Sequence, residues 1–162
     1  MRLGRAIAMA TALGVAAPAM AATVSARNPE TLVEALQAAG YEVVAGTDDT
    51  GDPVLDLVME GYKARLLFLD CDEAAHDKCG SIQFFSSFDA EGAGLSAGDA
   101  ILFARRYRYA SVTVNANGDP TLRWDIETGE GIPREVFLAA TERFLGTVQK
   151  MGATLFPSAP TG

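Results

Sequence analysis

Residues 41 to 88 contain four runs in which apolar and polar residues alternate, and only short turns separate the first three. The runs are Tyr41–Thr47, Val54–Met59, Tyr62–Asp70 and Ser81–Phe88. Alternation with a period of two is typical of strands that bury one face, and such short turns join neighbouring antiparallel strands. Because no helix separates these runs, the sequence predicts an antiparallel sheet rather than a parallel sheet with crossover helices.

Two segments that flank the strands have helical periodicity. In the first, Asn28 and Pro29 are typical of a helix start and Gly40 of a helix end. Its apolar positions are Leu32, Ala35, Leu36 and Ala39. The last helix is predicted to begin at Pro133, with one long apolar stripe made of Val136, Phe137, Ala140, Phe144, Val148 and Met151. Such a stripe predicts that the last helix packs along the sheet.

A third helix and a hairpin are predicted between these segments. Ser96 is a suitable N-cap for a helix that continues to about Arg106, and Asp99 is placed to complete a capping box. The runs Tyr109–Asn115 and Thr121–Ile126 then form a hairpin, whose Asn-Gly pair indicates a type I′ turn. The predicted order α-β-β-β-β-α-β-β-α describes an α+β fold in which the helices pack on one side of an antiparallel sheet.

The N-terminal residues 1–21 differ in character from the rest of the chain. They contain two arginines, an apolar run over Ala6–Ala17 and the small residues of Ala19–Ala21, a pattern that signal peptidase cleaves. The apolar run is too short to span a membrane. We therefore expect a signal peptide and a periplasmic or secreted mature protein that is not inserted in the membrane. It should consist of one domain over residues 26–156 and a disordered tail over 157–162.

The chain is acidic, with 13 Lys and Arg against 21 Asp and Glu and a formal net charge of −8. An acidic, exported protein is a poor candidate for binding nucleic acid or anionic lipid. One basic and aromatic segment, Arg105–Tyr109, departs from this composition. Cations at the end of a helix offset its dipole, which is the simpler explanation. The alternative is a contact with an anion or an acidic partner through Arg105 and Arg108.

Cys71 and Cys79 are the only cysteines, and they flank a polar loop between two predicted strands. In an exported chain this arrangement favours a disulfide. The alternative is a metal site formed by Cys71, His76 and Cys79, although their spacing matches no strong zinc signature. Because His76 is the only histidine, most arrangements of nucleophile, base and orienting acid are excluded. We identify no catalytic residue and expect no cofactor.

Several short motifs together resemble the YbjN family of small bacterial domains. In order, they are Asn28-Pro29, Gly40-Tyr41, Gly51-Asp52-Pro53, Glu60-Gly61, Phe68-x-x-Cys71, Cys79-x-Ser81-Ile82-x-Phe84, Arg108-Tyr109 and Gly118-Asp119-Pro120. The resemblance covers roughly Ala26 to Phe156 and implies a fold similar to the type III secretion chaperones. It also implies a sensory-transduction or stress-response regulator without catalytic residues. Where the family tends to carry two asparagines, this chain has Ile101 and Ala104.

Two functions remain open from the sequence. The first is an exported, non-catalytic binding or regulatory module that holds a protein or peptide. Its candidate surface combines an outward-facing apolar set on two strands with two arginines: Leu67, Leu69, Phe85, Arg105 and Arg108. The second is a metal-binding or hydrolytic protein centred on the loop of Cys71, His76 and Cys79. A third possibility is a homodimer in which the exposed sheet face is the interface between the two copies.

Overall fold

Six strands form one antiparallel sheet in the order β2-β3-β4-β5-β7-β6. The computed structural model describes residues 22–59, 61–90, 92 and 94–157, so the predicted signal peptide and positions 158–162 of the predicted tail lie outside the described residues. The strands are β2 (Glu42–Thr47), β3 (Pro53–Met59), β4 (Tyr62–Leu69), β5 (Ser81–Ser87), β6 (Ser111–Val114) and β7 (Pro120–Glu127). Because β2 to β5 pair in sequence order, the prediction of an antiparallel sheet is confirmed.

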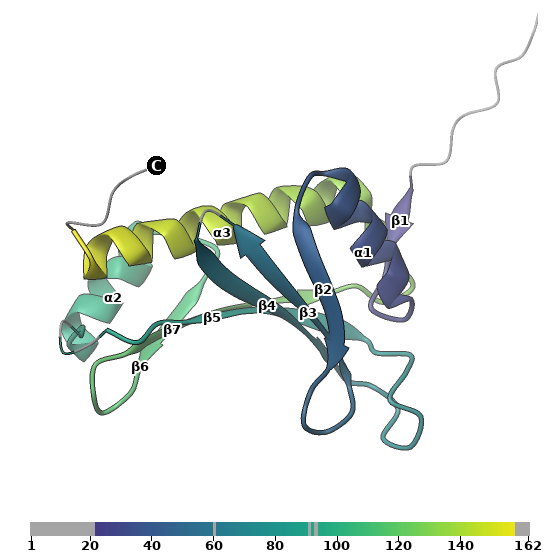
Figure 1. Cartoon of the computed structure of the whole chain (residues 1–162), viewed down its shortest axis with the longest axis horizontal. Coiled ribbons are helices and arrows are strands. Elements are labelled where there is room, and N and C mark those ends of the chain that lie inside the picture. The colour runs from purple at the N-terminus through teal and green to yellow at the C-terminus, as the bar shows by residue number, and fades with distance from the viewer. Residues whose placement is uncertain (1–21, 60, 91, 93, 158–162) are drawn as a thin grey trace, which may run out of the picture.

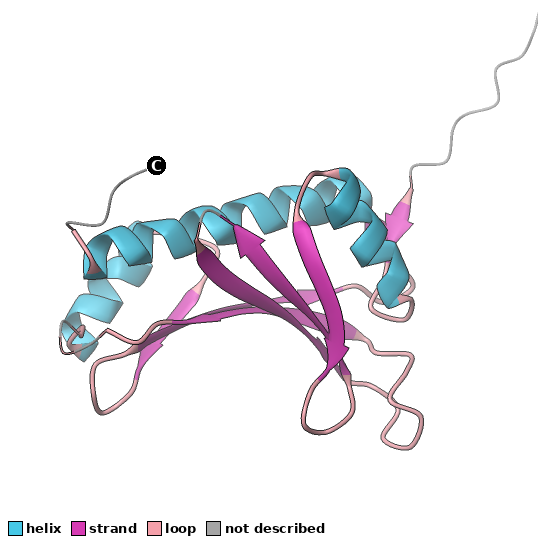
Figure 2. Ribbon diagram, in the orientation of Figure 1, coloured by secondary structure: helices cyan, strands magenta, loops and turns pink. Residues whose placement is uncertain are grey.

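Three helices lie on the same side of this sheet (Figures 1 and 2). They are α1 (Pro29–Ala38), α2 (Ala97–Arg106) and α3 (Arg134–Leu155). The longest, α3, crosses the strands, with α1 near one end and α2 near the other (Figure 1). The α+β class is therefore confirmed. Two very short strands that the sequence did not predict, β1 (Thr23–Val24) and β8 (Ile132–Pro133), pair beside the start of α3.

The core lies between α3 and the helix-side face of the sheet. Cross-strand pairing places Leu66 between Leu55 and Phe84, and all three side chains are fully buried on that face. From α3, the Phe144 ring stacks on Phe84 with 5.2 Å between ring centres, and Phe137 lies at 6.2 Å from the same ring. The predicted stripe on the last helix therefore faces the sheet, as its spacing requires.

The prediction is wrong for one residue of that stripe. Val136 is 53% exposed, whereas Phe137 beside it is fully buried. Successive residues of a helix lie about 100° apart, which places Val136 at the solvent edge of the stripe. Ala39 is also exposed, because it is the C-cap of α1 rather than part of its buried face.

Two predicted helix ends are confirmed. The Asp99 N–H donates to the Ser96 hydroxyl oxygen at 3.1 Å, and the Asp99 carboxylate accepts from the Ser96 N–H at 3.2 Å, which completes the capping box. After α1, Gly40 adopts a φ of +89°, and its N–H donates to the Gln37 carbonyl at 2.9 Å. Asn28 does precede α1, but its side chain makes no capping hydrogen bond.

The hairpin between β6 and β7 differs from its prediction. A type I′ turn needs a positive φ at both central residues, but of Asn117 and Gly118 only the glycine has one, at +84°. The N–H of Gly118 donates to the Asn115 carbonyl, and the Asn115 N–H donates to the Asp119 carbonyl. The Asn115 side-chain oxygen also accepts two backbone N–H groups. This side chain favours a three-residue loop that ends in a left-handed glycine.

Two glycines of α3 are expected to respond oppositely to alanine. A Cβ at Gly152 would overlap the ring of Tyr62, whereas a Cβ at Gly146 would meet only the Lys150 ammonium at 3.9 Å. We expect Gly152→Ala to destabilise the protein by about 1–3 kcal/mol through overpacking. Gly146→Ala should instead stabilise it by up to about 1 kcal/mol, because alanine favours the helix. Urea unfolding of both variants measures the difference, and effects of the same sign would contradict it.

Candidate functional site

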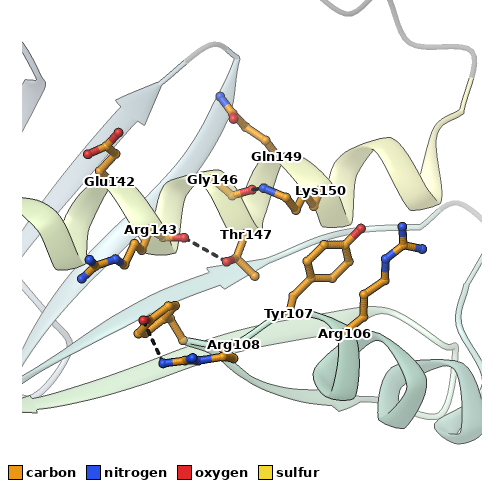
Figure 3. Close-up of a pocket in the computed structure, with 10 residues that line it drawn as sticks. Arg106, Tyr107, Arg108, Glu142, Arg143, Gly146, Thr147, Gln149 and Lys150 are labelled. Carbon is orange, nitrogen blue, oxygen red and sulfur yellow. Dashed lines mark hydrogen bonds between the residues drawn. The ribbon is translucent and has the colours of Figure 1, made fainter.

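A groove of about 680 Å³ lies between α3 and the segment that joins α2 to β6 (Figure 3). Its lining residues are Arg106, Tyr107, Arg108, Tyr109, Glu142, Arg143, Gly146, Thr147, Gln149 and Lys150. Four of these side chains are cationic and one is anionic. Since the whole chain has a net charge of −8, this local excess of positive charge makes the groove the candidate binding site.

Tyr109 lies between two arginines. The guanidinium carbons of Arg108 and Arg143 lie 5.0 Å and 5.2 Å from the centre of its ring, within the range of cation–π attraction. Arg108 also donates a hydrogen bond to the Tyr109 hydroxyl at 3.1 Å, and the ring of Trp124 lies 5.0 Å away. Tyr109 has a φ of +70°, which is rare for an aromatic residue and persists only where surrounding contacts hold it.

Tyr107, which also lines the groove, likewise has two cations beside its ring. Its ring centre lies 5.4 Å from the Arg106 guanidinium and 5.7 Å from the Lys150 ammonium. The Phe103 ring of α2 packs against it at 4.6 Å. Lys150 in turn donates to the carbonyl of Gly146 at 3.2 Å. Each groove tyrosine is therefore flanked by two cations, one from its own segment and one from α3.

The α3 side of the groove is built by helical spacing. Arg143 and Lys150 are separated by about two turns, so both side chains project from the same face. The Thr147 hydroxyl between them donates back to the Arg143 carbonyl at 2.9 Å (Figure 3). Glu142 supplies the one carboxylate, and its charge also acts on Tyr41. The pKa of Tyr41 is raised chiefly by burial and secondarily by that carboxylate.

The candidate surface residues of the sequence do not meet at one site. Leu67, Leu69 and Phe85 lie on the face of the sheet away from the helices, as their alternation predicts, and all three are half-buried. Arg108 lines the groove on the helix side, whereas Arg105 is an exposed residue of α2 that does not line it. The structure thus separates the apolar strand residues from the arginines.

Charged and polar side chains interrupt the outer face of the sheet. The Arg123 guanidinium lies 5.3 Å from the centre of the Phe85 ring. Nearby, Gln83 donates to the Asp125 carboxylate at 2.6 Å. An Asp56–Arg65 ion pair at 2.8 Å lies on the same face. The apolar strand residues of this face therefore lie among charged and polar side chains.

Sequence reasoning singled out the basic segment but missed its partners on α3. Arg143 and Lys150 were available as two cations two turns apart on the last helix. Nothing in the sequence places that face of α3 beside the end of α2, because the two helices are brought together by the path of the chain across the sheet.

The loop after β4 is closed by a Cys71–Cys79 disulfide, and the described residues contain no free cysteine. The His76 ring nitrogen Nδ1 lies 2.8 Å from a carboxylate oxygen of Asp52 in the β2–β3 turn. Asp72 accepts the N–H groups of residues 74 and 75, and these hydrogen bonds lower its pKa. The disulfide uses both thiols that the alternative metal site would need. Among the described residues, no three His, Cys, Asp or Glu side chains are grouped to hold a metal ion.

These features define a small α+β domain with a cationic, tyrosine-lined groove beside its longest helix. The chain belongs to the YbjN family, described as "Putative bacterial sensory transduction regulator", which matches residues 28–157. The resemblance seen in the sequence motifs is thereby confirmed. Within the described part of the chain, no helix has the length and apolar character needed to cross a membrane.

Among solved structures, the chain is similar to the crystal structure of an uncharacterized protein from Methanothermobacter thermautotrophicus. The TM-score is 0.55 at 10% sequence identity, over 78% of this chain and 94% of that chain. At this identity the likeness shows the fold alone. None of the curated proteins compared with the chain matches it.

Proposed function

We propose that the mature protein is an exported, non-catalytic regulatory module that binds an acidic segment of a protein partner in the tyrosine-lined groove. Membership of a family of regulators supports the regulatory role. The N-terminal sequence pattern and the disulfide support export, because disulfides persist in oxidising compartments. The periplasm is the compartment that we expect.

The observation that carries the proposal is the pairing of each groove tyrosine with two cations. Guanidinium groups form strong, bidentate hydrogen bonds with carboxylates, and Arg143 is placed to offer one. The backbones of Arg143 and Lys150 are about 10 Å apart along the helix axis, from a rise of about 1.5 Å per residue. The Lys150 ammonium folds back towards Arg143 to reach the Gly146 carbonyl, so the two charges are closer than that. Alternate side chains of an extended peptide lie on the same face, about 7 Å apart, so acidic side chains two residues apart can contact both cations.

A short acidic segment fits this protein better than a long polyanion does. Nucleic acid extends well beyond any one groove, and the net charge of −8 repels it over the rest of the surface. A short segment instead meets only the local positive charge of the groove. The proposed partner is therefore a protein with a short acidic stretch.

The test is a titration with a short, capped peptide of Asp and Glu, followed by tryptophan fluorescence. The chain has one tryptophan, and Trp124 lies 5.0 Å from the Tyr109 ring, so its emission reports on the groove. We expect saturable binding that weakens with added salt. Arg143→Ala should weaken it about tenfold, through loss of a charge-assisted hydrogen bond.

Lys63→Ala is the matched control, because it removes one positive charge from an exposed side chain of β4 on the outer face of the sheet. It should leave the affinity unchanged, and a peptide of Asn and Gln should not bind. Equal weakening in Lys63→Ala and Arg143→Ala would show general charge attraction and contradict a defined site. Absence of saturable binding at low salt would contradict the proposal itself.

A further inference from the structure

Two large apolar side chains of α2 are open to solvent close to the groove. Ile101 and Leu102 are each 61% exposed, whereas Ala100 and Phe103 beside them are buried. Among the described residues, six large apolar side chains are exposed. Three of them, Ile101, Leu102 and Tyr109, lie in the short segment that ends at the groove. Single exposed apolar residues are ordinary, but this local grouping is not.

A hollow of about 260 Å³ adjoins the groove on this side. Its lining residues are Leu95, Asp99, Leu102, Phe103, Arg106, Tyr107 and Thr154. Arg106 and Tyr107 line both depressions, so the hollow lies directly beside the groove. The carboxylate of Asp99 is engaged by the Ser96 hydroxyl at 2.6 Å. The remaining wall is formed mainly by leucine and aromatic side chains, and the hollow has room for a side chain rather than a small molecule.

We infer that the acidic segment bound by the groove carries a large apolar side chain, Leu or Phe, at one end, and that this side chain occupies the hollow against Leu102 and Phe103. This inference rests on the proposed function and specifies the chemistry of its partner. Charge complementarity places the acidic residues beside Arg143 and Lys150. Because the hollow lies directly beside the groove, a residue of the partner next to these acidic ones can reach its apolar wall.

The experiment compares three capped peptides with the full mature protein: one of Asp and Glu, the same peptide with a terminal Leu, and an Asn and Gln peptide with that Leu. The terminal Leu should tighten binding of the acidic peptide about tenfold, from partial burial of its side chain. Leu102→Ala should remove that gain and leave the affinity of the all-acidic peptide unchanged. Because Leu102 is exposed, the variant should fold normally, which circular dichroism verifies.

Val44→Ala is the matched control, because Val44 is 59% exposed on the distant strand β2. It should leave the binding of every peptide unchanged. Binding of the all-acidic peptide without any gain from the Leu would overturn this inference and leave the proposed function standing. Failure of both acidic peptides to bind would overturn both. An oligonucleotide that binds more tightly than either acidic peptide would also contradict a protein partner.

Discussion

Replacing Phe144 by alanine is expected to lower the free energy of unfolding by about 3–5 kcal/mol. Phe144 is fully buried, and its ring stacks on Phe84 at the centre of the sheet. The variant loses the transfer free energy of the ring and leaves a cavity between α3 and the sheet. Urea unfolding monitored by circular dichroism gives the change. Phe137→Ala should have a similar effect, because Phe137 is equally buried against the same ring.

Val136→Ala is the control on the same helix. Val136 is 53% exposed, so its truncation should change the free energy of unfolding by no more than about 0.5 kcal/mol. A loss below about 1 kcal/mol for both phenylalanine variants would show that α3 does not pack on the sheet as described.

Reduction of the Cys71–Cys79 disulfide is expected to lower the stability by about 2–3 kcal/mol without abolishing the fold. The bridge closes a short loop, so its removal restores conformational freedom mainly to that part of the unfolded chain. Cys79 is buried at the edge of the core and Cys71 packs against it, but the other core side chains, Phe84 and Phe144 among them, lie outside this loop and should keep the domain folded. Thermal melts with and without dithiothreitol measure the shift.

A Cys71→Ala/Cys79→Ala double variant is the control for that experiment. It should melt like the reduced protein and should not respond to dithiothreitol. EDTA should leave the melting temperature of the oxidised protein unchanged, because no metal contributes to stability on this view. Free thiols in the denatured protein, together with melting that EDTA lowers, would contradict the disulfide and favour the metal site.

The main elements of the fold could be predicted from the sequence because each has a strong local pattern. The alternation around Leu66 and the stripe around Phe144 identify both the element and its buried face. No local pattern predicts that β6 lies at the edge of the sheet. The chain leaves β5 through α2, and β7 rather than β6 then pairs with β5. The pair Thr23–Val24 is too short to show any period, and only its partner β8 makes it a strand.

Only one side of the candidate site could be predicted from the sequence. The segment that carries Tyr107 and Tyr109 is conspicuous because its charge and aromatic content differ from the rest of the chain. The hydrophobic stripe of α3 predicts which residues face the sheet, but Arg143 and Lys150 lie off that stripe. Their position beside α2 depends on tertiary packing, which periodicity does not report.

The cations of the groove lie against aromatic rings instead of carboxylates. Among the residues that the structure describes, no ion pair engages any of the four: Arg106, Arg108, Arg143 and Lys150. A ring restricts the rotamers of the cation beside it but leaves its charge uncancelled. Much of the conformational entropy of these long side chains is therefore lost when the chain folds rather than when a ligand arrives. Such a preorganised groove should discriminate among anions by the distance between their charges. Its cations have little freedom to move towards an anion whose charges are spaced differently.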